Sequence, residues 1–219
     1  MSECCNPSGY RQFFNQKQAR RSLRRYDKKG IDKMARAMVD YLVSRGMEGK
    51  SVLEAGGGIG AIQIELLKAG ASSTTNVELS GGYENIAVDL LDREGLYDRV
   101  ERRVGDFAEV SKDLEADDVV LNRVICCYPF MERLMGAALS SSRRFVAATF
   151  PRDRIGTKIA LSMGNAFCRL RGVDFRSYIH PPEAIRESAT GSGFDVVFHD
   201  RDFAWNAVVF ERVTGEPGK

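Results

Sequence analysis

Residues 52–67, with the sequence VLEAGGGIGAIQIELL, give the strongest indication of the fold of this chain. It starts as a short apolar run, passes through a glycine cluster and continues with apolar side chains at helical spacing. This order predicts a buried strand, a tight turn and a helix. Gly56, Gly58 and Gly60 alternate in the turn, where glycine permits positive φ and leaves bare backbone against which a ligand can lie. A structural turn needs fewer glycines, so the spacing favours a ligand-binding loop.

Short apolar runs alternate with amphipathic segments along the body of the chain. Strands are predicted at 51–55, 72–79, 100–104, 118–124, 144–150, 195–200 and 207–213. Helices are predicted at 12–27, 31–46, 62–70, 83–95, 132–139, 153–170 and 183–193. This alternation predicts an α/β fold, a Rossmann-like, doubly wound and mostly parallel seven-stranded sheet with added N-terminal helices. The last two strands are separated only by Arg201–Trp205, too short for a crossover helix, so the last strand is expected to be antiparallel.

Length and composition predict one compact domain. The chain has 219 residues, of which 43% are hydrophobic and 28% charged, values that exclude a largely disordered, collagen-like or membrane-embedded chain. We expect a helical extension or lid at 1–50, a core at 51–213 and a flexible tail at 214–219. The net charge of +2 does not by itself indicate a nucleic-acid partner.

Cysteine and histidine usage predicts no metal site. The five cysteines form no Cys-x-x-Cys pair, and only two histidines are present. The first residues lack the apolar core of a secretory signal, and no window of 18 apolar residues occurs. We therefore expect a cytoplasmic protein with free thiols and no membrane span.

The glycine cluster fits two cofactor patterns. Gly56, Gly58 and Ala61 satisfy the G-x-G-x-x-A pattern of dinucleotide-binding folds, and Glu78 lies 22 positions beyond Gly56, where a ribose-binding acid is expected. A NAD(P)-dependent oxidoreductase is thus one alternative. No tyrosine is followed four residues later by lysine, so the Tyr-x-x-x-Lys pair of short-chain dehydrogenases is missing. The same segment also fits E-x-G-x-G-x-G, beginning at Glu54.

This second pattern resembles the first motif of class I S-adenosylmethionine-dependent methyltransferases. Asp106 and Phe107, which follow the strand at 100–104, and the reversed last strand strengthen the resemblance. It implies that Glu78 holds the ribose hydroxyls and that Asp106 accepts a hydrogen bond from the adenine amino group. A helix N-cap is the alternative role for Asp106. The cofactor-binding residues implied are Glu54, Gly56, Gly58, Gly60, Glu78, Leu79, Asp106, Phe107 and Asn122.

The segment VICCYPF (124–130) bears on the methyl acceptor. It lacks the Asn-Pro-Pro-Tyr sequence of many amino methyltransferases. A closer likeness is to magnesium-protoporphyrin O-methyltransferases, carried by Ser8-Gly9-Tyr10, Phe13-Phe14, the glycine stretch, the Gly-Asp-Phe turn at 105–107 and Tyr128-Pro129. That group tends to have histidine where this chain has Cys127.

The resemblance implies methyl transfer by in-line displacement to a small-molecule acceptor, with a carboxyl or hydroxyl oxygen favoured and a porphyrin-like acid as one candidate. A carboxylate needs no general base, because it is already ionised at neutral pH. Candidate substrate-binding residues are Tyr10, Phe14 and Cys127, and candidate catalytic residues are Tyr128 and His180. Packing or capping is the alternative role for these side chains.

Two further alternatives stay open. Residues 1–50 hold twelve Lys and Arg against five Asp and Glu, which would suit a nucleic-acid methyltransferase, although a solvated helix face explains the same charges. A non-catalytic cofactor-binding protein would also keep the glycine loop. The oligomeric state is not predicted.

Overall fold

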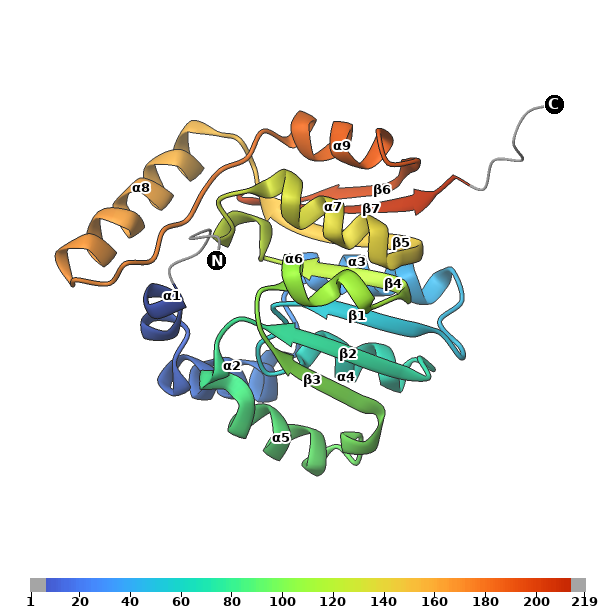
Figure 1. Ribbon diagram of the computed structural model, residues 1–219. Coiled ribbons are helices and arrows are strands. Elements are labelled where there is room, and N and C mark those ends of the chain that lie inside the picture. Colours follow the sequence, from blue (N-terminus) through green and yellow to red (C-terminus); the bar gives the residue numbers. More distant parts are fainter. Residues whose placement is uncertain (1–6, 214–219) are drawn as a thin grey trace.

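A seven-stranded sheet forms the centre of the molecule in a computed structural model that describes residues 7–213 (Figure 1). The strand order is β3-β2-β1-β4-β5-β7-β6. Neighbours among β1 to β5 pair in parallel, and β7 is antiparallel to both β5 and β6. The Rossmann-like sheet with its antiparallel last strand is therefore confirmed, whereas the tail at 214–219 lies outside the described residues. The strands are β1 Ser51–Ala55, β2 Ser73–Glu78, β3 Val100–Val104, β4 Ala116–Asn122, β5 Ser142–Pro151, β6 Phe194–Arg201 and β7 Trp205–Arg212.

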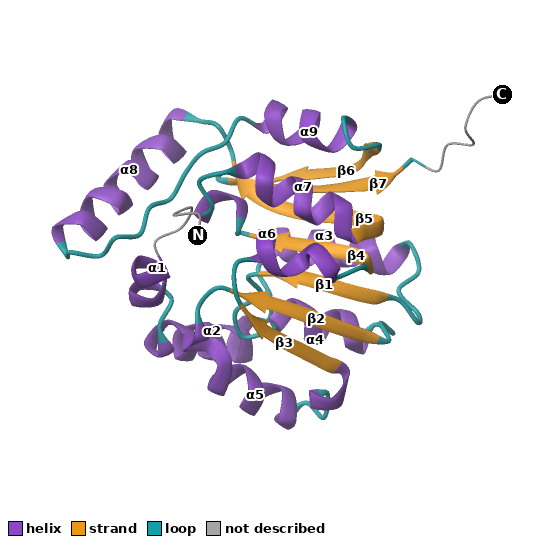
Figure 2. Ribbon diagram, in the orientation of Figure 1, coloured by secondary structure: helices purple, strands orange, loops and turns teal. Residues whose placement is uncertain are grey.

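Helices cover both faces of the sheet (Figure 2). Apolar residues of α2, α3, α4 and α5 belong to the core on one face, and those of α6, α7 and α9 to the core on the other. The helix α8 instead projects beside the sheet, and α1 lies between it and α2. The helices are α1 Pro7–Phe13, α2 Gln16–Lys29, α3 Lys33–Ser44, α4 Ala61–Lys68, α5 Glu84–Arg93, α6 Phe107–Val110, α7 Met131–Ser141, α8 Ile155–Leu170 and α9 Pro182–Thr190.

Several element boundaries differ by a few residues from the prediction, and two of the differences have clear local reasons. The single helix predicted at 12–27 is wrong, because Asn15 adopts an extended conformation and its side chain accepts hydrogen bonds from the backbone N–H groups of Lys17 and Gln18. Asn15 thus separates α1 from α2 as an N-cap. The strand predicted to reach residue 124 ends at Asn122, since Arg123 takes a φ of +59° in the left-handed region.

The parallel strands place their carboxyl ends along one edge of the sheet. The glycine turn after β1 and the loops after β2, β3 and β4 therefore meet there. The helix α1 closes over this edge, where its Tyr10 packs with Cys168 and Phe175. Gly9 permits that packing, because a Cβ atom there would lie 1.8 Å from the carbonyl oxygen of Asp174. No helix of the described residues is long and apolar enough to cross a membrane.

Candidate cofactor site

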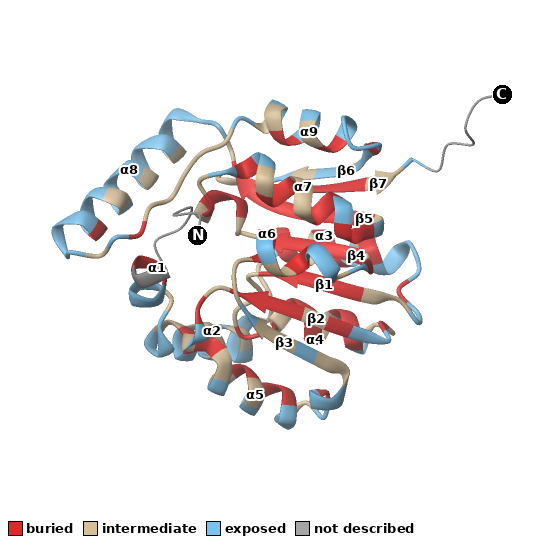
Figure 3. Ribbon diagram, viewed as in Figure 1, coloured by how far each residue is buried: buried red, intermediate tan, exposed pale blue. Residues whose placement is uncertain are grey.

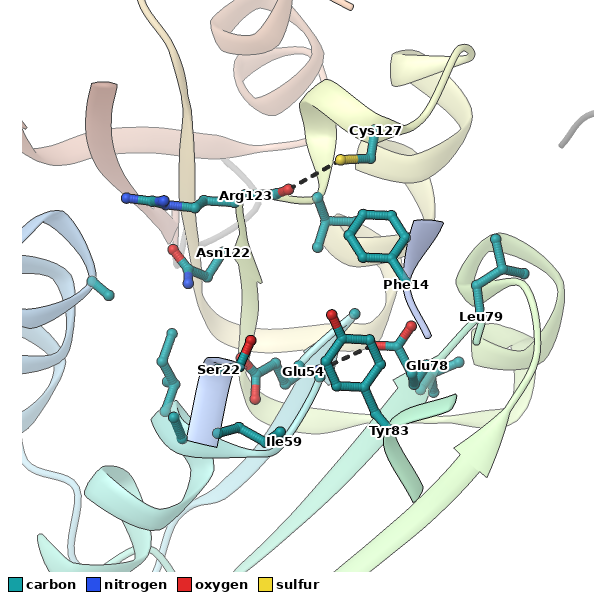
Figure 4. A pocket seen from close by; sticks show the side chains of 18 of the residues that line it. Phe14, Ser22, Glu54, Ile59, Glu78, Leu79, Tyr83, Asn122, Arg123 and Cys127 are labelled. Atoms are coloured by element: carbon teal, nitrogen blue, oxygen red, sulfur yellow. Dashed lines mark hydrogen bonds between the residues drawn. The ribbon is translucent and has the colours of Figure 1, made fainter. Parts of the chain in front are cut away.

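A cavity of about 350 Å³ opens at the carboxyl edge of β1, β2 and β4 (Figure 4). This volume is within the range of small-molecule sites. Most of the site residues predicted from the sequence line it, and Gly60 and His180 do not. Those that line it are Tyr10, Phe14, Glu54, Gly56, Gly58, Glu78, Leu79, Asp106, Phe107, Asn122, Cys127 and Tyr128.

The glycine loop forms the floor of the cavity and has no room for side chains. Gly56 and Gly58 take φ values of +61° and +57°. A Cβ atom on Gly56 would lie 2.7 Å from the Val124 side chain, and one on Gly57 would lie 2.4 Å from Glu54 Oε2. Gly60, with a φ of +81°, is the N-cap residue of α4. The glycines are thus required by backbone geometry and by close packing.

Glu78, the last residue of β2, is held rigidly by backbone donors. Its Oε2 accepts a hydrogen bond from the Gly58 N–H at 3.0 Å, and its Oε1 accepts one from the Ser80 N–H at 3.1 Å. Burial raises the pKa of Glu78, while the two N–H donors favour its charged form. Each oxygen keeps acceptor capacity for a further donor, because a carboxylate oxygen has two lone pairs.

Glu54, in β1, is buried beneath the glycine loop. Burial raises its pKa from 4.5 to about 8. Its Oε2 finds no hydrogen-bond partner among the described residues. A buried carboxyl with an unused oxygen is well suited to receive a cationic donor group.

Asp106, just after β3, has two partners in the structure. Its Oδ1 accepts from the backbone N–H of Ala108 at 3.0 Å and so caps α6. The Tyr128 hydroxyl lies 2.9 Å from Oδ2. The capping role considered for Asp106 is thus present, and the Tyr128 hydroxyl holds the carboxylate at the cavity.

The end of β4 supplies a polar and a cationic side chain. The Thr149 hydroxyl donates to Asn122 Oδ1 at 2.6 Å. The Arg123 guanidinium lies 4.4 Å from the centre of the Trp205 ring and 3.3 Å from Asp32 Oδ1. Arg123 thereby connects the end of β4 to the start of α3.

An apolar wall closes the cavity on the side of α1. Tyr10 and Phe175 belong to a small apolar cluster, and Phe14, Leu79 and Cys127 pack against it. The Phe14 ring lies 5.2 Å from the ring of Phe175. The hydrogen bond with Cys126 and burial raise the pKa of the Cys127 thiol well above its ordinary value. The Cys127 thiol therefore stays protonated at neutral pH and is a poor nucleophile.

Sequence reasoning missed most of the polar wall formed by α2. Gln18, Ser22, Arg25 and Tyr26 line the cavity at intervals of four, three and one residues, which places them on one helix face. This helical spacing could have indicated a polar wall, but the many charged residues of α2 made the lining residues hard to distinguish.

His180 lies outside the cavity lining, in the loop before α9. Its Nε2 is 2.9 Å from the backbone carbonyl oxygen of Tyr128. Of the two candidate catalytic side chains, Tyr128 lines the cavity and contacts Asp106, whereas His180 contacts the Tyr128 backbone from outside the lining.

No protein-family model and no curated protein matches the sequence. Solved structures do match. Magnesium protoporphyrin IX methyltransferase from Synechocystis PCC 6803, with bound S-adenosylhomocysteine, is 19% identical at a TM-score of 0.75 over 95% of this chain and 100% of that one. An O-methyltransferase family protein from Burkholderia thailandensis is 18% identical at a TM-score of 0.65, over 93% and 64%. The [4+2]-cyclase SpnF is 15% identical at 0.62, over 82% and 81%. The chain therefore has the fold of class I S-adenosylmethionine-dependent methyltransferases.

Proposed function

We propose that this protein is an S-adenosylmethionine-dependent methyltransferase that methylates a carboxyl or hydroxyl oxygen of a small molecule. The observation that carries the proposal is the fixed carboxylate of Glu78, which lies in one cavity with the glycine loop, Glu54 and Asp106. The fold alone would not suffice, because one fold can host several reactions.

The hydrogen bonds of the glycine loop favour a sulfonium cofactor over a dinucleotide. A dinucleotide site offers free backbone N–H groups to a pyrophosphate. Here the N–H groups of Gly57 and Gly58 donate to Asn76 Oδ1 and Glu78 Oε2. Two N–H donors of the loop are thus already occupied by side chains of β2.

The charge of the cavity supports the same choice. Four carboxyl groups line it, those of Asp32, Glu54, Glu78 and Asp106, against the two guanidinium groups of Arg25 and Arg123. Asp32 and Arg123 pair with each other. Glu54 is largely protonated at neutral pH, since its pKa is about 8, so the carboxylates of Glu78 and Asp106 against Arg25 leave a small acidic excess. This excess suits a cofactor with a sulfonium and an ammonium group and opposes a pyrophosphate.

The residues present fit such a cofactor, and each has a proposed task. Glu78 would hold the ribose hydroxyls, Asp106 the adenine amino group, and Glu54 with Asn122 the methionine end. The cofactor supplies an electrophilic methyl group. The chain then has to align the acceptor oxygen and exclude water, which the apolar wall of Tyr10 and Phe14 supports.

Neither of the two candidate catalytic side chains is placed to act as a general base, which favours an acceptor that is already ionised. The Tyr128 hydroxyl is engaged by Asp106, and His180 does not line the cavity. A carboxylate needs no deprotonation near neutral pH, whereas an aliphatic hydroxyl does. We therefore rank a carboxyl oxygen above a hydroxyl, with porphyrin-like acids as one candidate class.

The amino-terminal helices complete this proposal as a lid. Phe14, directly after α1, and Ser22, in α2, project into the cavity (Figure 4). The Ser80 hydroxyl donates to the Phe14 carbonyl oxygen at 2.5 Å, tying the lid to the loop after β2. Opening of this contact would admit cofactor and acceptor.

Transfer of a labelled methyl group tests the proposal. The purified protein would be incubated with methyl-labelled S-adenosylmethionine and a panel of carboxylic acids, including magnesium protoporphyrin, together with phenols and RNA. We expect label in a product that alkali cleaves, because methyl esters hydrolyse in base and methyl ethers do not. Label in RNA alone would establish the nucleic-acid alternative. Cofactor binding without transfer to any acceptor would support the non-catalytic alternative.

A further inference from the structure

The helix α8 carries an apolar stripe that faces away from the rest of the protein. Ile155, Ile159, Met163, Phe167 and Leu170 are 81%, 56%, 68%, 56% and 86% exposed. Their spacing of four, four, four and three residues puts them along one side of the helix. Figure 3 shows α8 as exposed over most of its length.

Contacts on the opposite side of α8 fix this orientation. Thr157, Leu161, Asn165 and Cys168 are its less exposed residues. The Asn165 side chain exchanges two hydrogen bonds of 2.8 Å with the backbone of Ser177. A surface helix ordinarily buries its apolar side and exposes its polar side. In α8 the apolar side is exposed instead, and the two hydrogen bonds of the Asn165 side chain with Ser177 fix this orientation.

The surroundings of the stripe are basic. The sequence of α8 contains no acidic residue, and Lys158 and Arg169 lie on it. Arg152 and Arg154 precede it. The backbone N–H of Arg152 donates to the carbonyl oxygen of Ala204 at 2.8 Å, which brings the turn with the 81% exposed Phe203 beside the start of α8.

Within the described residues, Arg152 and Arg154 form no salt bridge. Loss of solvation and the charges of Arg154 and Arg201 lower the pKa of Arg152, and the nearby carboxylate of Asp202 opposes this shift without reversing it. Asp153, the acid nearest in sequence, pairs with Lys158 at 2.5 Å. A net positive charge thus remains beside the apolar stripe within the described residues, because the guanidinium groups of Arg152, Arg154 and Arg169 outnumber the carboxylate of Asp202.

We propose that α8 and the turn at Phe203 form a docking surface for the anionic face of a lipid bilayer. An apolar stripe inserts among the acyl chains near the headgroups, while flanking lysine and arginine side chains reach lipid phosphates. Each such cation near an anionic surface strengthens binding by about fivefold.

A second copy of the chain fits this surface less well. Antiparallel pairing of two α8 helices about Met163 would bring Arg154 of one copy toward Arg169 and Arg171 of the other. Parallel pairing would bring equal charges together along the whole helix. Repulsion between like charges opposes both arrangements, whereas an anionic surface attracts the same lysine and arginine side chains.

Docking would place the cavity near the lipid. The last turn of α8 packs through Cys168 against Tyr10 and Phe175, and Tyr10 lines the apolar wall of the cavity. The docking surface itself does not depend on the proposed methyl transfer.

Vesicle sedimentation of the full chain tests the proposal. The protein would be mixed with vesicles of phosphatidylcholine alone and with vesicles of equal parts phosphatidylcholine and phosphatidylglycerol, at low and high salt. We expect binding to the anionic vesicles that weakens with salt, and at least tenfold weaker binding to the neutral ones. A chain that stays in the supernatant with anionic vesicles at low salt would overturn the proposal.

Two variants locate the surface. Met163→Glu combined with Phe167→Glu should weaken vesicle binding by at least tenfold, because each apolar side chain lost from the lipid costs about that factor. The matched control is Tyr97→Glu, which also replaces a side chain of half-exposed character, remote in sequence from α8. Circular dichroism confirms that each variant is folded. Equal binding by both variants would refute the assignment to α8. A dimer that the double variant dissociates, without vesicle binding, would show that a second copy occupies the stripe.

Discussion

Replacement of Glu78 by glutamine is the sharpest perturbation of the site, because it changes charge without changing size. One carboxylate oxygen becomes an NH₂ group. In the wild-type protein, each carboxylate oxygen accepts a hydrogen bond from a backbone N–H group, that of Gly58 or that of Ser80. The new NH₂ group must therefore face one of these N–H groups or turn away from it. The variant therefore loses one backbone acceptor and the charge that strengthens hydrogen bonds from ribose hydroxyls.

The magnitude follows from these contacts. A hydrogen bond to a charged group contributes about 1.5–3 kcal/mol, so losing one such bond to the cofactor should raise the dissociation constant of S-adenosylhomocysteine by about tenfold to a hundredfold. The lost backbone bond should lower the free energy of unfolding by about 1 kcal/mol. In a chain of this length that corresponds to a fall in Tm of about 2–4 °C.

Isothermal titration calorimetry and thermal unfolding measure the two effects separately. The matched control is Glu101→Gln, which neutralises an exposed carboxylate paired with Arg103 on the neighbouring strand β3. It should leave cofactor affinity unchanged. An affinity of Glu78→Gln equal to that of the wild type, in a folded protein, would refute the role of Glu78 as the ribose-binding residue.

Three further substitutions have defined outcomes. Burial raises the pKa of Glu54 to about 8, so the folded state holds an extra proton between pH 4.5 and about 8, and the free energy of unfolding falls as pH rises through that window. Glu54→Gln should remove this part of the fall, as measured by urea titrations at several pH values. An unchanged pH dependence would contradict this prediction. Gly9→Ala should displace α1 and weaken S-adenosylhomocysteine binding, whereas Gly156→Ala, where a Cβ meets nothing within 4 Å, should not; equal affinities would argue against the lid. Tyr128→Phe frees Asp106 and should weaken cofactor binding by about fivefold, since one hydrogen bond contributes about 1 kcal/mol; calorimetry showing wild-type affinity would exclude this positioning role.

The sequence predicted those parts of the fold that depend on local patterns. β1 and β3 have the predicted bounds. β1 is a buried apolar run followed by turn residues, a pattern that specifies a strand strongly, whereas β3 has the sequence VERRV and contains no buried residue. The loop of Gly56 and Gly58 and the acid at Glu78 were predictable for the same reason: backbone geometry and chain spacing decide them.

Other features depend on contacts between segments far apart in sequence. Nothing near Tyr128 indicates that its hydroxyl holds Asp106, 22 residues away along the chain. The break between α1 and α2 was visible in principle, since asparagine is a preferred N-cap. The exposure of the apolar side of α8 was not predictable, because apolar residues at helical spacing ordinarily indicate a buried face.

Calorimetric titration of the wild-type protein would show whether this cavity binds S-adenosylmethionine. S-adenosylhomocysteine and NAD would be titrated in parallel under the same conditions. We expect micromolar binding of S-adenosylhomocysteine, abolished by Glu78→Ala, and no heat from NAD. Binding of NAD with no binding of S-adenosylhomocysteine would contradict the account.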